Sequence, residues 1–228
     1  MLPKHFPQRP EIDLFATLRP AKTVGGDLYD FRLDGDRLWF VVGDVSGKGV
    51  PAALFMAVTK VLFGVSVEVE SSPAAVMSRV NRALCRENEH FLFVSAFLGR
   101  LDVRTGELEY ANAGHNLPYR LRGDGSVSTL PASPGLVMGV NDEFVYRTES
   151  TRLEAGDGVF LFTDGVTEAI DTKNELFSEA RLEAYLESVK GWSPVEVVAG
   201  ALRALDDFVG RASQFDDITA LSVRYRPD

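Results

Sequence analysis

Cysteine, long apolar runs and an excess of positive charge are all scarce in this sequence of 228 residues. The single cysteine, Cys85, cannot form an internal disulfide, which favours a reducing compartment. No uninterrupted apolar run reaches the roughly 18 residues that a membrane helix needs, since the nearest candidate, 50–67, carries Lys60. The first residues also lack the apolar segment of a secretory signal. These absences together predict a cytoplasmic protein.

The charge balance is acidic, with a formal net charge of −9. A nucleic-acid partner is therefore not expected, because phosphate backbones are bound by clustered Lys and Arg. An apolar content of 45% excludes whole-chain disorder and supplies a core. We find no repeat and no low-complexity tract. The prolines at 3, 7 and 10 predict an extended lead-in over residues 1–11, followed by one domain over residues 12–228.

Hydrophobic periodicity predicts a strand-rich chain with paired helices. Strand patterns fall at 12–18, 28–33, 38–45, 91–103, 107–112, 119–122, 127–130, 144–153, 159–163 and 218–225. Helical patterns fall at 51–63, 73–86, 178–189 and 194–209, the second with Ser72 as its N-cap. Most strands follow one another through short glycine-containing turns, as in antiparallel hairpins. The pattern therefore predicts an α+β fold in which two mainly antiparallel sheets are flanked by helix pairs.

Aspartates recur at the ends of the expected strands, each beside glycine or a second acid. They lie in Gly25-Gly26-Asp27-Leu28-Tyr29-Asp30, Gly43-Asp44-Val45-Ser46-Gly47-Lys48-Gly49, Phe162-Thr163-Asp164-Gly165 and Phe215-Asp216-Asp217-Ile218-Thr219. Asp44 and Asp164 each close a run too apolar to be exposed, so their carboxylates could meet at the sheet rim. Closely packed carboxylates repel one another, and a hard cation such as Mg²⁺ or Mn²⁺ relieves that repulsion. For any one of them alone, a turn or helix-cap role is the more common explanation, but the set favours a metal site.

The same segments, in this order, resemble the PPM/PP2C metal-dependent serine/threonine phosphatases, specifically their bacterial SpoIIE/RsbU-like branch. The resemblance extends from about residue 12 to residue 224. It is carried by Arg19-Pro20-Ala21, Val24-Gly25-Gly26-Asp27-Leu28-Tyr29-Asp30, Gly43-Asp44-Val45-Ser46-Gly47-Lys48-Gly49, Ala111-Asn112-Ala113-Gly114-His115-Asn116, Thr163-Asp164-Gly165-Val166-Thr167-Glu168-Ala169 and Asp216-Asp217-Ile218-Thr219. It implies an α-β-β-α sandwich that holds two Mn²⁺ or Mg²⁺ ions.

Carried over position by position, the implied metal ligands and catalytic residues are Asp27, Asp44, Asp164 and Asp216, with the backbone carbonyl of Val45 as a further ligand. Asp44 would bridge both metals, Asp27 would bind one, and Asp164 and Asp216 the other. Asp217, Ser46, His115 and, less directly, Asp30 would support the ligands without touching a metal. The implied mechanism is in-line attack on phosphorus by a hydroxide held between the two cations, without a phosphoenzyme.

Two positions depart from the better-known PP2C pattern, and the bacterial branch shares both departures. Ser46 stands where that pattern has a histidine, and its hydroxyl is too weak an acid to protonate a leaving group at neutral pH. Thr23 stands near the place of a phosphate-holding arginine, with Arg19, Lys22 and Lys48 only as neighbours. His115 is an alternative acid, although a hydrogen-bonding turn residue is the more common explanation. The general acid and the phosphate-binding group stay unassigned.

The helix that follows the bridging aspartate is a candidate regulatory element, because its movement would shift Asp44 or Val45. We expect Pro51, Leu54 and Val58 to belong to it, with the helix over 73–86 as its neighbour. The resemblance implies a phosphorylated STAS-domain protein of the anti-sigma-antagonist type as substrate in a partner-switching pathway. It also implies an upstream sensor or linker segment, a parent protein that in some cases is membrane-anchored, and in some cases a homodimer.

Two other functions remain open. A catalytically silent PP2C-fold binding module would have lost a metal ligand, yet Asp27, Asp44, Asp164 and Asp216 are all present. A hydrolase of small phosphoesters or nucleotides would need a substrate pocket, and 43–49 lacks the spacing of a P-loop. A phosphoprotein substrate therefore fits best.

Overall fold

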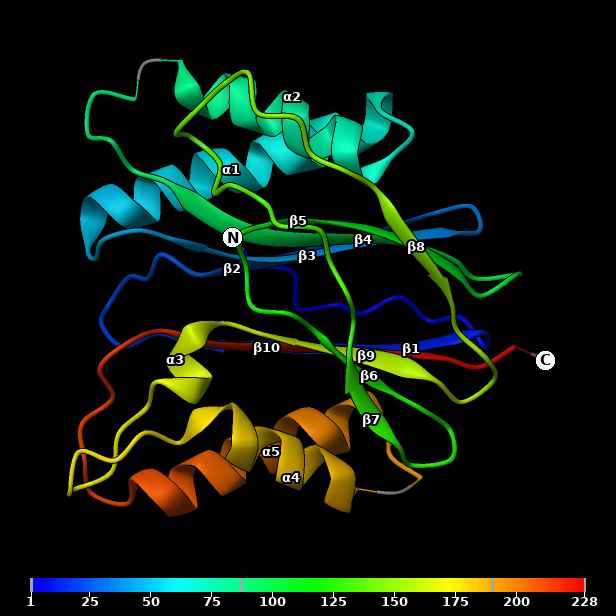
Figure 1. Cartoon of the computed structure of the whole chain (residues 1–228), viewed down its shortest axis with the longest axis vertical. Helices are drawn as coiled ribbons and strands as arrows, with labels where there is room; N and C mark the ends of the chain where they lie inside the picture. Colours follow the sequence, from blue (N-terminus) through cyan, green and yellow to red (C-terminus); the bar gives the residue numbers. More distant parts are fainter. Residues whose placement is uncertain (1, 87, 190, 228) are drawn as a thin grey trace.

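The computed structural model of the chain describes residues 2–86, 88–189 and 191–227. Two five-stranded antiparallel sheets pack face to face, and helices cover both outer faces (Figure 1). The first sheet has the order β1 (Ile12–Arg19), β10 (Ile218–Tyr225), β9 (Gly158–Phe162), β6 (Tyr119–Leu121) and β7 (Val127–Thr129). The second has the order β2 (Leu28–Asp34), β3 (Arg37–Val45), β4 (Val94–Asp102), β5 (Glu107–Ala113) and β8 (Glu149–Arg152). The predicted α-β-β-α sandwich is confirmed.

Helices α1 (Val50–Val69) and α2 (Pro73–Cys85) cover the second sheet, and α4 (Ser178–Ser188) and α5 (Pro194–Val209) cover the first (Figure 1). Ser72 caps α2 by accepting the Ala75 N–H, as expected from the sequence. Ser193 caps α5 in a complete capping box with Glu196. A single turn, α3 (Asp164–Thr167), follows β9 at one end of the sandwich.

The hydrophobic core has three layers that follow the period-two alternation of the strands. Phe40, Phe97 and Leu221 belong to the layer between the two sheets. A second layer lies between the second sheet and α1 and α2, and a third lies between the first sheet and α4 and α5. Two buried faces make the central strands β3 and β9 apolar almost throughout. The polar ends of these strands are consequently the places where a site can form.

Two expectations about the elements were wrong, and one element was not expected. Helix α1 continues from the predicted end at 63 to Val69, because Ser66 packs inside and Glu68 pairs with Arg32 of β2. The predicted strand over 144–153 is a strand only over β8, since its first part crosses the α2 side, where Tyr146 is buried and donates to the Leu136 carbonyl. The turn α3 was not predicted because four residues carry no periodicity.

By length and composition alone, α1 is also apolar enough to cross a membrane, although the sequence reading excluded this on account of Lys60. In the structure Lys60 forms an ion pair with Asp30, and α1 packs on β2, β3 and α2. The helix therefore belongs to this fold.

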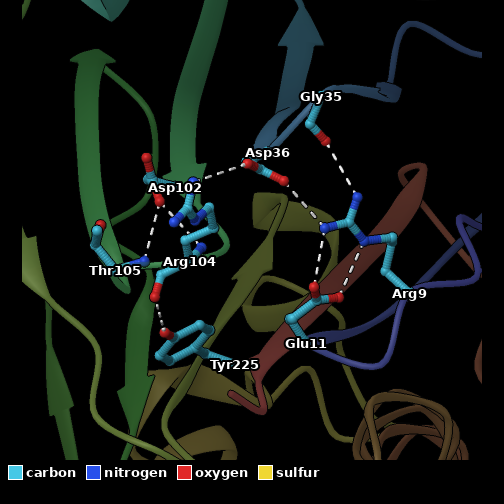
Figure 2. A network of polar contacts seen from close by, with 8 residues as sticks. All are labelled: Arg9, Glu11, Gly35, Asp36, Asp102, Arg104, Thr105 and Tyr225. Atoms are coloured by element: carbon cyan, nitrogen blue, oxygen red, sulfur yellow. Dashed lines mark hydrogen bonds and ion pairs between the residues drawn. The ribbon is translucent and has the colours of Figure 1, made fainter. Parts of the chain in front are cut away.

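A polar network joins the two sheets at the end of the sandwich opposite α3 (Figure 2). Arg9, in the lead-in, binds Glu11 and, at 3.1 Å, Asp36 in the β2–β3 turn. Arg104, in the β4–β5 turn, approaches Asp36, and the Tyr225 hydroxyl of β10 donates to the Arg104 carbonyl. These contacts tie the lead-in to turns of the second sheet and to the last strand of the first.

Candidate metal centre

Four loops converge at the α3 end of the sandwich, namely β1–β2, β3–α1, β9–α3 and α5–β10 (Figure 1). Glycines mark the points of closest approach. A Cβ added at Gly25 would lie 2.1 Å from Asp217 Oδ2, and one at Gly165 would lie 1.8 Å from the Asp217 carbonyl oxygen. A Cβ at Gly26 would lie 2.9 Å from the Val45 carbonyl oxygen. These glycines therefore let neighbouring loops approach one another at a separation that a side chain would prevent.

Asp27, which immediately precedes β2, is the most deeply buried acid of the site, with 2% of its surface exposed. Its Oδ2 accepts hydrogen bonds from the hydroxyls of Thr163 (2.7 Å) and Thr219 (2.5 Å), both of which belong to the opposite sheet region. Burial raises the pKa of Asp27 well above its usual range, and the nearby charge of Asp44 raises it further. A carboxylate in such a position needs a compensating positive charge to ionise.

Asp44, near the end of β3, and Asp164, at the start of α3, face the same space. Burial and the charge of Asp164 raise the pKa of Asp44 from 3.8 to about 7. Burial likewise raises the pKa of Asp164, with added repulsion from Glu168 and Asp216. The carboxylates of Asp44 and Asp164 therefore lie close together at the rim of the sandwich, as expected, and they repel one another.

Asp216 and Asp217, in the loop before β10, have different surroundings. Asp216 is partly exposed and forms an ion pair with Lys48 at 2.8 Å. The Asp217 carboxylate is buried and accepts the backbone N–H groups of Ala21 (2.8 Å) and Gly26 (2.7 Å). Asp217 thus holds the β1–β2 loop that carries Asp27, the kind of supporting position that the sequence suggested for it.

The donor set suits a hard divalent cation. It consists of carboxylates and the Val45 carbonyl, which faces the cleft beside Gly26, and the acids raise one another's pKa values where no positive charge compensates. Within residues 2–86, 88–189 and 191–227, no three His, Cys, Asp or Glu side chains already stand together in metal-binding geometry. The residues that would hold metal ions are Asp27, Asp44, the Val45 carbonyl, Asp164 and Asp216, and this assignment stays a prediction.

Two predicted supporting residues lie away from this cleft. Asp30 projects from β2 toward α1 and pairs with Lys60 at 2.7 Å. Its role is to tie a strand to a helix, and the structure does not bring it to the other aspartates. The Ser46 hydroxyl accepts the Phe93 N–H at 2.9 Å and so extends the β3–β4 pairing.

His115 lies inside the sandwich, 6% exposed, in the loop after β5. Its Nδ1 lies 2.9 Å from the Ser95 hydroxyl, and Ser95 is the cross-strand neighbour of Asp44. The Asn112 side chain bonds both the N–H and the carbonyl of His115. Burial lowers the pKa of His115 to about 4, so its imidazole is neutral at pH 7 and is not a proton donor for a leaving group.

The expected regulatory helix presents an apolar stripe to solvent. Leu54 is 64% exposed and Val58 is 53% exposed, and Pro51 stands in the first turn of α1. The other exposed apolar residues of the stripe are Val50, Val61, Val65 and Val69. Since α1 begins a few residues after Asp44, the helix that carries this stripe follows the end of β3, which carries Asp44 and Val45, after a short loop.

Thr163 and Thr219 are functional residues that the sequence reading did not single out. Both hydroxyls converge on one oxygen of Asp27, although the three residues are far apart in the chain. Each threonine stands in a quoted motif, next to Asp164 or shortly after Asp217. The motifs could have suggested them, but their shared target follows only from the packing of the sheets.

This sandwich, with a carboxylate cleft at its rim, has the architecture of PP2C-type phosphatase domains. The family model described as stage II sporulation protein E (SpoIIE) matches residues 34–226. The chain therefore belongs to the SpoIIE family, as its motifs indicated.

Individual relatives support this assignment. The chain is 32% identical over 222 residues to phosphoserine phosphatase RsbU of Bacillus subtilis, covering 96% of this chain and 64% of RsbU. The SiaA-PP2C domain of Pseudomonas aeruginosa superposes with a TM-score of 0.83 at 26% identity, covering 94% of this chain and 86% of that one. RsbX, solved in complex with magnesium, shares the fold with a TM-score of 0.73 at 17% identity, covering 96% and 98%. The chain thus spans less than two thirds of the length of RsbU.

Proposed function

We propose that this chain is a Mg²⁺- or Mn²⁺-dependent protein phosphatase that removes phosphate from phosphoserine or phosphothreonine. The observation that carries the proposal is the convergence of Asp27, Asp44 and Asp164 at one rim, with raised pKa values. PP2C-type phosphatases depend on metal ions, and bound cations would compensate the repulsion between these carboxylates.

Divalent cations bound there would activate a water molecule for attack on phosphorus and neutralise charge on the phosphoryl oxygens. The chain's own residues prepare the site. Thr163 and Thr219 fix the orientation of Asp27 by donating to one of its oxygens, which leaves the other oxygen available as a ligand. Asp217 holds the neighbouring loop through its backbone N–H groups. This preorganisation limits the rearrangement that binding requires.

The proposed substrate is a phosphorylated STAS-domain protein in a partner-switching pathway. The relative RsbU is named a phosphoserine phosphatase, and its greater length fits a parent protein with an upstream sensor or linker. We further propose that the α1 stripe, including Leu54 and Val58, receives the regulatory signal, in the cytoplasm and in some assemblies as a homodimer.

The alternative of a small-phosphoester hydrolase stays open. The cleft lined by Asp44, Asp216 and Asp217 has a volume of about 10 Å³, roughly what one water molecule needs. A neighbouring hollow of about 280 Å³, lined by Arg19, Gly165 and Asp216 among others, is large enough for part of a small substrate, so turnover of a phosphoprotein and of nucleotides has to be compared. A phosphoprotein, which brings its own docking surface, remains the preferred substrate. A catalytically silent binding module remains the second alternative, and a measurement of phosphatase activity distinguishes it from an enzyme.

The deciding experiment measures hydrolysis of p-nitrophenyl phosphate with Mn²⁺, Mg²⁺ or EDTA. Asp44→Ala should abolish a metal-dependent rate, whereas Asp13→Asn, an exposed β1 position paired with Arg226, should not change it. Turnover of a phosphoprotein and of nucleotides, compared directly, then separates the two hydrolase alternatives. A wild-type protein that hydrolyses neither substrate and binds no Mn²⁺ in a calorimetric titration would support the binding-module alternative, whereas Mn²⁺ binding without turnover would indicate a site that awaits an activating partner.

A further inference from the structure

Lys48 is the one amine in the described part of the chain that donates a hydrogen bond to an aspartate of the site. Its Nζ lies 2.8 Å from Asp216 Oδ2 and 2.8 Å from the Phe215 carbonyl oxygen. It lines the open cleft together with Asp44, and its charge lowers the pKa of Asp164 against the prevailing repulsion. Lys48 thus brings positive charge to the place where a phosphoryl group would have to approach.

The Lys48 amine is held by more than its ion pair. It lies 4.2 Å from the centroid of the Phe215 ring, within cation–π range. Phe215 is 75% exposed, so its ring lies at the protein surface beside the amine. Together with the Phe215 carbonyl, the ring would hold the amine at the mouth of the cleft even when Asp216 binds a metal ion instead of Lys48.

The ion pair with Asp216 does not by itself explain why a lysine stands at position 48. Both side chains are more than a third exposed, and exposed ion pairs of this kind contribute little to stability. Asp216 is also a proposed metal ligand, and a cation there would share its charge. A phosphate monoester offers the amine a partner with nearly two negative charges and several acceptor oxygens.

The neighbouring cations are less suited to this task. Arg19 is engaged by Asp206 through two hydrogen bonds, the shorter at 2.5 Å. Lys22 lines the same cleft, but it donates to none of the aspartates in the described part of the chain.

We propose that Lys48 is the phosphate-binding side chain of this site and that Phe215 positions its amine. The inference rests on the proposed phosphatase function. Lys48 would supply the positive charge that an arginine provides in the better-known PP2C pattern and that Thr23 lacks. In the bound state the amine turns from Asp216 toward a phosphoryl oxygen while it keeps its contact with Phe215.

The test compares Lys48→Met, Lys48→Arg and the matched control Lys22→Met with the wild type. Three quantities are measured: kcat/KM for p-nitrophenyl phosphate, the inhibition constant of inorganic phosphate, and Mn²⁺ affinity by calorimetry. Loss of a charge-assisted hydrogen bond predicts that Lys48→Met weakens phosphate inhibition and lowers kcat/KM by about 10- to 100-fold. Lys48→Arg should recover part of both, and Lys22→Met should change them less than about threefold. Mn²⁺ affinity should stay within about threefold of the wild-type value in every variant.

Phosphate inhibition within twofold of wild type in Lys48→Met would overturn the proposal. A parallel fall in Mn²⁺ affinity would also overturn it, because Lys48 would then act only through Asp216. Phe215→Ala should give a smaller loss of phosphate affinity than Lys48→Met, and no loss would remove the ring from the proposal. If the wild type hydrolyses nothing, the proposed function fails, and calorimetric binding of inorganic phosphate to the Mn²⁺-loaded proteins still decides the role of Lys48.

Discussion

The carboxylate cleft should make the metal-free protein lose stability as pH rises, and Asp44 is the residue through which this can be measured. Burial and the charge of Asp164 raise its pKa in the folded protein from 3.8 to about 7. Between these values the folded state holds a proton that the unfolded state has released. Stability therefore falls from about pH 4 to about pH 7, and the loss is complete above pH 7.

The size of this effect follows from the shift. A displacement of roughly three pKa units corresponds to about 4 kcal/mol at 1.36 kcal/mol per unit, an upper value because solvent reaches part of Asp44. Asp44→Asn removes the ionisation and keeps the side-chain volume. We therefore expect this variant to be more stable than the wild type by about 2–4 kcal/mol at pH 8, and by almost nothing at pH 4.

Chemical denaturation in EDTA, at pH values between 4 and 8, measures both proteins. The matched control is Asp13→Asn, an exposed aspartate whose variant should stay within about 0.5 kcal/mol of the wild type throughout. Parallel stability curves for the wild type and Asp44→Asn would refute the reasoning. Mn²⁺ should reverse the order of stabilities at pH 8, because it would bind the folded wild type more tightly than a variant that lacks the Asp44 carboxylate.

Two further predictions concern the surroundings of the cleft. Thr219→Val removes the shorter of the two hydroxyl contacts to Asp27 and should weaken Mn²⁺ binding about tenfold in a calorimetric titration, since buried carboxylates lose orientation without their donors. An unchanged affinity would show that Thr163 alone suffices. Leu54→Asp places a charge on the exposed stripe of α1 and should alter the rate or the metal dependence of hydrolysis while circular dichroism stays unchanged. A variant with both properties intact would count against the regulatory role of this helix.

Most of the fold could be predicted from the sequence because its signals are local. The hairpin β2–β3 follows from two apolar runs around Asp34-Gly35-Asp36-Arg37, and α2 follows from Ser72 and Pro73 at its start. Wrong expectations arose where packing overrides local preference. Ser66 holds the end of α1 inside the fold, and Tyr146 draws the segment before β8 across the helix layer.

The site divides in the same way. The aspartates and their glycines could be recognised from sequence, because a carboxylate at the end of an apolar strand beside a glycine is a local pattern. Asp30 belongs to the same motif as Asp27, yet it faces α1, because residues three apart on a strand point to opposite sides of the sheet. The sequence around Lys48 and Lys22 did not indicate which of the two lysines would contact Asp216, although both line the same cleft.

The sequence by itself thus determined the fold class, the family and the identity of the acids, since all three depend on the order and periodicity of residues along the chain. Only the tertiary structure decided which donors serve which carboxylate. Thr163 and Thr219 meet at Asp27, Asp217 reaches Gly26, and Lys48 reaches Asp216, each across more than 50 residues of chain. These partnerships exist only where the two sheets pack together, and the direction of a side chain across that interface is not encoded in its sequence neighbours.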